Sequence, residues 1–341
     1  MYTDIPFWLS IVFMLGGLAA LAWSSDVFVD GAAAVAKRLG ISPFIIGMVI
    51  IGFGTSAPEL CVSVMSGLSG HADLSLGNAY GSCSFNIAMI LGISVLIFPL
   101  VVKPSVSFVA GPGLAAISIF SMLVLRDGIC SRTEAAILLG AFLVVLPLYC
   151  WYDQRTKPPE PEDEKGEGDA KKISLPVAIL KLAVGLGTLI GSSHVLVWGA
   201  VEFAKFVGVS DLVIGLTIVA AGTSLPELAS AVASARRGEH EFVLGNIIGS
   251  NLFNTLAVVG LATVICPLEP KVVDGVTRPG FSSYVLTRDL PYVLVLSLSI
   301  LAFGINWKHP KWPGVIQRKE AWAWILSFVA YTGLMLWQES H

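Results

Sequence analysis

Charged residues are scarce in this chain of 341 residues: Asp, Glu, Lys and Arg together make up 13% of it. An ordinary globular domain contains about 25% charged residues, so this chain has too little polar surface to cover a body in water. Hydrophobic residues make up 55%, and the mean hydropathy is +0.78. These values indicate a membrane protein whose main partner is the lipid bilayer, and they exclude a large aqueous domain.

Several function classes also lack their signals. The net charge is −3, and no basic stripe is present to neutralise phosphates, so no nucleic-acid partner is expected. No obligate protein partner is evident. The five cysteines form no Cys-x-x-Cys pair, which argues against a disulfide framework or a zinc site. The chain has neither a His-Glu-x-x-His motif nor a Gly-x-Ser-x-Gly elbow, so we expect neither an enzyme nor a bound cofactor.

Apolar runs separated by polar clusters predict about ten membrane-spanning helices. Five are expected at 7–36, 42–68, 72–98, 106–125 and 133–152, and five more at 174–204, 210–235, 239–265, 289–306 and 321–337. No basic segment precedes the first apolar run, so it is expected to be a retained helix and not a cleaved signal peptide. The fold class predicted is an all-α polytopic membrane protein.

The distribution of Lys and Arg predicts the orientation of the chain. The segment 153–172 contains a Pro-Pro pair and mixed Glu, Asp and Lys residues, so it is expected to be a solvated linker. Of the 21 Lys and Arg residues, 15 fall on the side of this linker and 6 on the other. The positive-inside rule then places the linker in the cytoplasm and both termini outside the inner (plasma) membrane.

An internal repeat is the strongest signal in the sequence. The string Gly-Thr-Ser-Ala-Pro-Glu-Leu at 54–60 recurs as Gly-Thr-Ser-Leu-Pro-Glu-Leu at 222–228, an offset of 168 residues. With the same offset and no gap, Gly-Asn-x-x-Gly-Ser-x-x-Phe-Asn at 77–86 recurs at 245–254. Over 47–60, eight of fourteen positions are identical in the two copies.

Each copy carries five predicted helices. Because five is odd, the second copy enters the membrane from the opposite side, and the repeats are inverted. Inverted repeats are typical of secondary transporters, which bind substrate near the bilayer midplane between the repeats. We expect a first repeat at 1–152 with its motif region at 47–92, a cytoplasmic linker at 153–172, and a second repeat at 173–341 with its motif region at 215–260.

Glu59 and Glu227 occupy the same place in the two copies, about 17 residues into their predicted helices and so near the middle of the bilayer. A carboxylate at this depth is costly, and such residues usually face a cavity and mark an ion pathway. The alternative is that each is a protonated packing residue, but packing alone does not explain why both copies share the same neighbours.

Proline precedes each glutamate. Pro58 and Pro226 are expected to break their helices and to free carbonyl groups near Gly54 and Gly222. The hydroxyl residues beside these breaks are Thr55, Ser56, Thr223 and Ser224. Hydroxyls, carbonyls and a carboxylate form an all-oxygen set, which suits a hard cation such as calcium, whereas soft metals prefer thiolate or imidazole.

The second motif adds neutral oxygen atoms. Ser82 and Asn86 are four residues apart and share a helix face, and Ser250 and Asn254 are their counterparts. Small residues at Gly77, Gly81, Gly245 and Gly249 are expected to let helices approach closely. Asn78 and Asn246 are expected to satisfy backbone groups freed by the breaks, with a ligand role as the alternative.

Other ionisable residues carry weaker expectations. Interfacial solvation near helix ends is the expectation for Asp26, Asp30, Asp73, His71 and His240. His194 and Glu202 lie in the sixth predicted helix, where they would fit a proton route if they were deep in the membrane.

The two Gly-Thr-Ser-x-Pro-Glu-Leu strings and the two Gly-Asn-x-x-Gly-Ser segments resemble the alpha repeats of the calcium:cation antiporter superfamily, in particular those of prokaryotic sodium/calcium exchangers. The resemblance covers 17–92 and 185–260, and the ten-helix plan matches over the whole chain. It implies exchange of calcium for sodium or protons, with Glu59 and Glu227 as the central ligands. The other ligand positions that it implies are Thr55, Ser56, Ser82, Asn86, Thr223, Ser224 and Ser250.

One position departs from the family pattern. Exchangers of this family often carry Asp where this chain has Asn254, which we include in the candidate set as a neutral ligand. Two carboxylates are neutralised by one calcium ion, two sodium ions or two protons, whereas three sodium ions leave an excess positive charge in a site of low dielectric constant. The departure argues against three-for-one sodium exchange and gives weight to a proton-coupled variant.

The sequence therefore predicts a calcium/sodium antiporter that works by alternating access at one central site. A calcium/proton antiporter, or one for another divalent cation and protons, is the first alternative. A cation channel is the second, although channels usually repeat their filter by oligomerisation.

Overall fold

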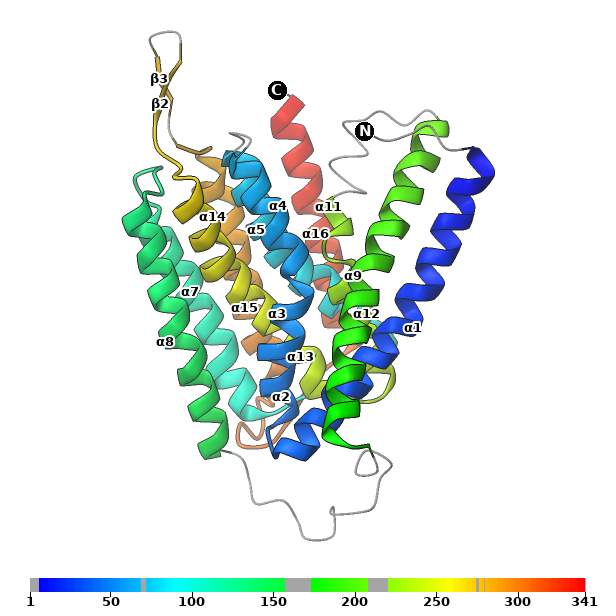
Figure 1. Ribbon diagram of the computed structural model, residues 1–341. Coiled ribbons are helices and arrows are strands. Elements are labelled where there is room, and N and C mark those ends of the chain that lie inside the picture. Colours follow the sequence, from blue (N-terminus) through cyan, green and yellow to red (C-terminus); the bar gives the residue numbers. More distant parts are fainter. Residues whose placement is uncertain are drawn as a thin grey trace.

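The computed structural model describes residues 6–68, 72–156, 173–207, 220–273, 276–278 and 280–340. It is helical almost throughout (Figure 1). The first half contains α1 (Phe7–Leu39), α2 (Pro43–Ile46), η1 (Gly47–Ile51), α3 (Gly52–Thr55), α4 (Ala57–Leu68), α5 (Ala72–Phe85), η2 (Asn86–Leu91), α6 (Gly92–Ile97), β1 (Leu100–Val102), η3 (Val106–Ala110), α7 (Gly111–Val124) and α8 (Arg132–Thr156), where η marks a π-helical turn.

The second half repeats this order. It contains α9 (Leu175–Phe206), α11 (Ala220–Gly222), α12 (Leu225–Arg236), α13 (His240–Leu252), η7 (Phe253–Val258), α14 (Val259–Ile265), β2 (Lys271–Val273), β3 (Val276–Arg278), η8 (Val285–Asp289), α15 (Leu290–Gly304), β4 (Gly314–Ile316) and α16 (Arg318–Ser340). The offset of 168 residues found in the sequence carries the start of α1 to the start of α9 and the start of α5 to that of α13.

The predicted spans agree with these helices to within four residues at each end, wherever the structure describes them. Among the described residues, seven helices are long and apolar enough to cross a membrane, or eight if the bent pair Pro43–Thr55 and Ala57–Leu68 is one span. The other two predicted spans are 321–337, observed as α16, and 210–235, of which 210–219 lies outside the described residues. The molecule is an all-helical, multi-pass membrane protein.

The two halves run in opposite directions. In Figure 1, α1 descends from the end of the molecule where α16 finishes, and α9 ascends toward that same end. The end of α8 and the start of α9 lie at the opposite end. This antiparallel arrangement of equivalent helices is the inverted repeat that the sequence predicts.

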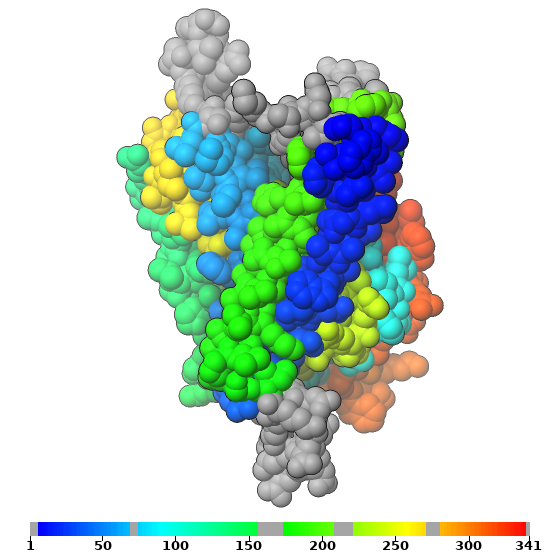
Figure 2. All heavy atoms as spheres, turned by 45° about the vertical axis from the view of Figure 1, so that its right-hand side comes forward, coloured from blue at the N-terminus to red at the C-terminus, as the bar shows by residue number. Residues whose placement is uncertain are grey.

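Helices α1 and α9 lie side by side across one face of the molecule (Figure 2). They pack backbone to backbone through glycines of both helices. A Cβ atom at Gly31 would lie 2.6 Å from the backbone nitrogen of Leu182, and one at Gly185 would lie 2.7 Å from Cα of Phe28. A side chain at either position would therefore separate the two helices.

The central core is built by α5 and α13 with their continuations. Every residue of α13 from Phe242 to Leu252 is buried. Glycine again permits the close approach, because a Cβ atom at Gly249 would lie 2.6 Å from Cα of Met48 in η1, and one at Gly245 would lie 3.0 Å from its nitrogen. The expected packing role is confirmed for these two glycines. For Gly77 and Gly81 no described atom lies within 4 Å of such a Cβ.

Short strands join some of the connections between helices, which the sequence did not predict. Strands β1 and β4 pair antiparallel, with Leu100 opposite Ile316, and β2 pairs with β3 in a hairpin. Backbone groups at helix ends lack helical partners, and pairing between two connections satisfies them. The strands lie outside the spans and leave the helical plan unchanged.

Candidate ion-binding site

The two motif helices are broken beside their glutamates. The first half-span and α4 meet at an angle of 42°, with Ser56 at the break, and in the second repeat Thr223 and Ser224 form a turn between α11 and α12. Pro58 and Pro226 lie in the first turn of the new helix, where a missing N–H costs little. The predicted break is thus confirmed, with a new helix that begins one residue before each proline.

This geometry puts each glutamate at a helix start. Glu59 and Glu227 lie in the first turn of α4 and α12. The N-terminal end of a helix carries a partial positive charge and favours a carboxylate there. Both glutamates are fully buried, with 0% of their surface exposed.

The carboxylates are held by hydroxyls from the opposite repeat. Ser56 donates a hydrogen bond of 3.0 Å to Oε1 of Glu227, and Ser224 donates one of 2.9 Å to Oε1 of Glu59. The two motifs therefore form one cluster at the interface between the repeats.

The threonine and serine residues of the first repeat extend this cluster. The Thr55 hydroxyl lies 2.9 Å from the Ile51 carbonyl and 3.4 Å from Oδ1 of Asn246. Ser82 Oγ lies 3.4 Å from Ser224 Oγ. Ser250 donates instead to the carbonyl of Gly52, at 3.3 Å.

Asn78 and Asn246 donate hydrogen bonds to the backbone carbonyls of the two glutamates. Asn78 donates to the carbonyl of Glu59 at 3.0 Å and to Ser63 Oγ at 2.9 Å. Asn246 makes the equivalent bonds to the carbonyl of Glu227, at 3.3 Å, and to Ser230 Oγ, at 3.0 Å. The expected bonding to the backbone is observed, but at the glutamate carbonyls.

The prolines are predicted to free carbonyls near Gly54 and Gly222. The Ser56 N–H donates to the Gly52 carbonyl, at 3.2 Å, and Gly222 O accepts a 3.0 Å hydrogen bond from Ser193 Oγ in α9. The Gly222 carbonyl is therefore paired by a serine of a neighbouring helix.

Several buried oxygen atoms have no hydrogen-bond partner within the described part of the chain. Among them are Oε2 of Glu59, Oε2 of Glu227, Oδ1 of Asn86 and Oδ1 of Asn254, whose Nδ2 is also unpaired. Buried polar groups are almost always paired, since an unpaired one costs roughly 1–3 kcal/mol. Asn86 and Asn254 lie in the π-helical turns η2 and η7, a form of helix that is frequent at functional sites. Unpaired oxygens on two buried carboxylates and two buried amides fit a hard cation.

The site has only two acidic groups. No cluster of three or more His, Cys, Asp or Glu residues occurs in the described ranges. The remaining candidate ligands are neutral hydroxyl and amide groups, so the ligand set carries a charge of −2 when both carboxylates are ionised.

Comparison with known proteins identifies the family. The family model described as "Sodium/calcium exchanger protein" matches residues 9–151 and again residues 177–337. The chain belongs to the sodium/calcium exchanger family. This is a family of cation transporters and not of enzymes, and its two matched segments are the two halves described above.

Relatives and solved structures span the whole fold. The chain is 40% identical to the putative antiporter CaxA of Alkalimonas amylolytica over 85% of this chain and 90% of that protein, and 34% identical to the inner membrane protein YrbG of Escherichia coli over 90% and 91%. It is 26% identical to the sodium/calcium exchanger MaX1 of Methanosarcina acetivorans over 90% and 95%. The sodium-calcium exchanger NCX_Mj, soaked with sodium, superposes with a TM-score of 0.77 at 26% identity, covering 97% of this chain and 99% of that one.

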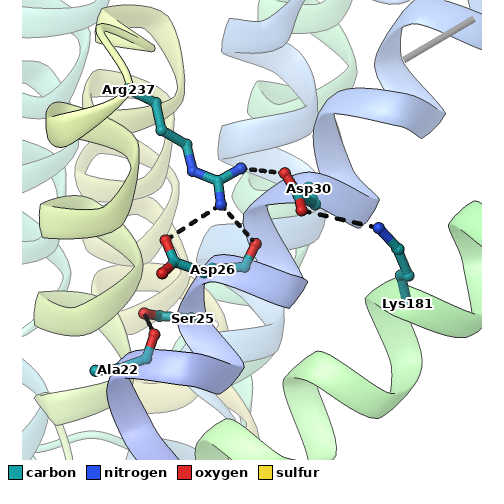
Figure 3. A network of polar contacts seen from close by, with 6 residues as sticks. All are labelled: Ala22, Ser25, Asp26, Asp30, Lys181 and Arg237. Atoms are coloured by element: carbon teal, nitrogen blue, oxygen red, sulfur yellow. Dashed lines mark hydrogen bonds and ion pairs between the residues drawn. The ribbon is translucent and has the colours of Figure 1, made fainter. Parts of the chain in front are cut away.

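A second polar cluster in this family member lies away from the glutamates (Figure 3). Arg237, at the turn after α12, pairs with Asp30 and donates hydrogen bonds of 3.1 Å to the carbonyl and the carboxylate of Asp26. Lys181 of α9 lies 3.8 Å from Asp30. Burial lowers the pKa of the Arg237 guanidinium, but its bonds to the two aspartates more than offset this and raise the pKa above the ordinary value.

This cluster corrects one expectation. Asp26 and Asp30 lie within α1, well before its end, and they are ion-paired as well as partly exposed. Glu202 is buried and pairs with Lys205 at 3.0 Å, whereas His194 is exposed on α9. The structure therefore does not link His194 and Glu202 into a proton route.

Interfacial solvation is also expected for His71, Asp73 and His240. His240 is the first residue of α13 and is partly buried. His71 lies outside the described residues, and the side chain of Asp73 is likewise not described.

Two further residues form hydrogen bonds with the repeated motif and were not predicted from the sequence. Ser193 bonds the Gly222 carbonyl, and Asn251 bonds Asn86 at 3.1 Å. Selecting identical residues in the two copies could not find Asn251, because the offset places Cys83 at its equivalent position. The available signal was a second asparagine in the same buried helix, directly after Ser250.

Proposed function

We propose that the protein is an antiporter that exchanges calcium for sodium at one site between Glu59 and Glu227. The observation that carries the proposal is the crossed pair of buried carboxylates. Each is held by a serine of the other repeat, and each keeps one oxygen without a protein partner among the described residues. Membership of the sodium/calcium exchanger family supports the same substrates.

The proposed ligands come from both repeats. The first repeat supplies Glu59, Thr55, Ser56, Ser82 and Asn86, and the second supplies Glu227, Thr223, Ser224, Ser250 and Asn254. Oxygen ligands alone suit calcium, which takes six to eight of them. Ser250 joins this set only if its hydroxyl leaves the Gly52 carbonyl when the ion binds.

The charge of the site limits what it can exchange. One calcium ion or two sodium ions balance the two carboxylates, and we infer a ratio of two sodium ions to one calcium ion. An empty site would hold two uncompensated charges in the membrane, which is costly. The empty carrier therefore does not reorient, and exchange is obligatory.

Alternating access follows from the repeat symmetry. Inverted-repeat transporters move one bundle against another around a fixed midplane site. Here α1 and α9 form a pair on one face, packed through glycines, while the site lies on the other helices of both repeats. We propose that this pair moves relative to the rest and opens the site first to one side and then to the other.

Protons are the alternative counter-ion. Two protons also neutralise Glu59 and Glu227, and Asn254 removes the third acid that would favour three sodium ions. A calcium/proton antiporter, or one for another divalent cation, would use the same site and the same movement.

The placement in the cell is part of the proposal. We propose repeats at 1–152 and 173–341, joined by a cytoplasmic linker at 153–172, of which 157–172 lies outside the described residues. With 15 basic residues on the linker side against 6, both termini face outward across the inner membrane. The name of the relative YrbG, an inner membrane protein, supports this location.

The test compares two driving gradients in proteoliposomes. Vesicles loaded with sodium at equal internal and external pH are compared with sodium-free vesicles whose interior is acidic, and radioactive calcium uptake is followed in both. The proposal predicts uptake driven by sodium and abolished by a sodium ionophore. Uptake driven only by the pH gradient would show that protons, and not sodium ions, are the counter-ion. Uptake driven by neither gradient would overturn antiport.

A further inference from the structure

We propose that Asn251 is a positioning residue, which fixes the Asn86 side chain so that its oxygen, and not its nitrogen, is presented to the transported cation. The inference rests on the proposed function in that it takes the cation to bind beside Glu59 and Glu227. It concerns a residue that differs between the two copies of the motif and its contacts with the end of α5 and the start of η2.

Hydrogen-bond polarity dictates the orientation. Asn251 Nδ2 donates to the backbone carbonyl of Cys83 at 3.3 Å. A carbonyl only accepts, so the nitrogen of Asn251 has to face Cys83 and its Oδ1 has to face Asn86. That oxygen also only accepts, so Asn86 presents Nδ2 to it, at 3.1 Å. The oxygen of Asn86 is thereby turned away from Asn251.

The unpaired Oδ1 atom of Asn86 is assigned to the ion-binding site. Asn86 is completely buried, and its Oδ1 has no partner among the described residues. Asn86 follows Ser82 by one helical turn, and Ser82 lies beside Ser224, which binds Glu59. A buried, unpaired amide oxygen one helical turn from this serine pair is the type of ligand that calcium takes.

The second repeat lacks this anchor. The offset of 168 residues relates Asn254 to Asn86 and relates Cys83 to Asn251. The Cys83 thiol lies 3.4 Å from Thr255 Oγ1 and 3.7 Å from the Asn251 carbonyl, and a thiol is a weak acceptor. Neither amide atom of Asn254 has a partner in the described ranges. The site thus has one fixed neutral oxygen from the first repeat and one unanchored amide from the second.

The first test removes the anchor. Asn251→Ala leaves the Asn86 amide able to turn its nitrogen toward the cation, which repels a positive charge. Calcium uptake by proteoliposomes should then show a KM about tenfold higher, as when an outer partner of a metal ligand is lost, with a smaller change in maximal rate. Ser118→Ala in α7 is the matched control and should leave KM unchanged, because this buried serine donates to the Leu114 carbonyl of its own helix.

The decisive test changes the residue that is positioned. Asn86→Asp places a carboxylate at position 86, which offers an oxygen in either orientation and needs no anchor. On this background, Asn251→Ala should raise the calcium KM no further. A merely structural role for Asn251 would raise KM equally in both backgrounds, and that result would overturn the inference.

These outcomes are separable from failure of the proposed function. If the unaltered protein transports no calcium under any gradient, the proposed function fails. If it transports calcium and Asn251→Ala leaves its KM unchanged, only the positioning role fails. Thermal unfolding of each variant, measured with and without calcium, shows whether a loss of transport reflects a loss of folding.

Discussion

Each glutamate of the site depends on the other repeat. Ser56 and Ser224 reach across the interface to the opposite carboxylate, so neither repeat contains a complete site. Hydrogen bonds to a charged group contribute about 1.5–3 kcal/mol. The crossed bonds therefore link ion binding to contact between the repeats.

Removal of either carboxylate is the first prediction at this scale. Glu59→Gln or Glu227→Gln leaves a calcium ion with one compensating charge in a buried site. Breaking a buried charge pair costs roughly 3–5 kcal/mol, so calcium transport should fall at least about 100-fold in a proteoliposome uptake assay. Glu202→Gln alters a buried glutamate outside the site and is the control. Full transport by both site variants would remove the glutamates from the mechanism.

The second prediction at the residue scale concerns the addition of a carboxylate to the site. Exchange of one calcium ion for two monovalent ions moves no net charge, so uptake by the unaltered protein should not respond to a membrane potential set with potassium and valinomycin. Asn254→Asp creates a site of charge −3 that holds a third monovalent ion, and its uptake should become voltage-dependent. Asn306→Asp, in an exposed connection, should not have this effect. Voltage-dependent uptake by the unaltered protein would contradict the two-for-one ratio.

At the level of single residues, the sequence predicted only those site residues that are repeated in both halves. Identity between the copies selected Glu59, Ser56 and their counterparts, which the structure brings together. It could not select Asn251, whose equivalent is a cysteine, or the partners of Asp26 and Asp30. Those contacts depend on which helices are neighbours in space, and an internal repeat does not specify that.

At the scale of elements, close helix contacts in the core depend on glycine. A methyl group at Gly249 would overlap the backbone of Met48. Overpacking of this kind costs typically about 1–3 kcal/mol, so Gly249→Ala should lower the thermal unfolding temperature and reduce transport. Gly140→Ala in α8, where no described atom lies within 4 Å of the added carbon, is the matched control. Equal unfolding temperatures for the two variants would show that the contact is not tight.

The pairing of α1 with the turn after α12 is the second element to test. Arg237→Gln removes the ion pairs to Asp26 and Asp30 and frees the linker-side end of α1. A partly exposed pair contributes up to about 1 kcal/mol, so amide hydrogen exchange in residues 30–39 should quicken about fivefold. Arg318→Gln breaks only a bond to the Leu96 carbonyl and serves as control. Unchanged exchange would mean that the ion pairs of Arg237 do not hold this end of α1.

Hydropathy was sufficient to predict most helices, because each span needs about 20 apolar residues wherever it lies. It could not predict the exact break at Ser56, since proline tolerates the first turn of a new helix and so marks a break only to within a turn. Hydropathy did not predict strands β1 to β4 either. Three-residue strands arise from neighbouring connections and carry no periodic pattern.

At the scale of the whole molecule, the two inverted halves meet at the buried cluster that holds Glu59 and Glu227. The offset of 168 residues predicted this arrangement from sequence, and the antiparallel course of α1 and α9 agrees with it (Figure 1). The symmetry is imperfect where it matters for chemistry, at Cys83 opposite Asn251. A site built from two nearly equal halves can be presented to either side of the membrane by equivalent movements.

The most direct test of obligatory exchange is calcium efflux from loaded proteoliposomes into three media, containing sodium, calcium, or neither ion, at equal internal and external pH. Because an empty site would leave Glu59 and Glu227 uncompensated in the membrane, efflux should proceed into sodium and into calcium and should nearly stop when both are absent. Efflux at the same rate into all three media would contradict antiport and indicate a channel.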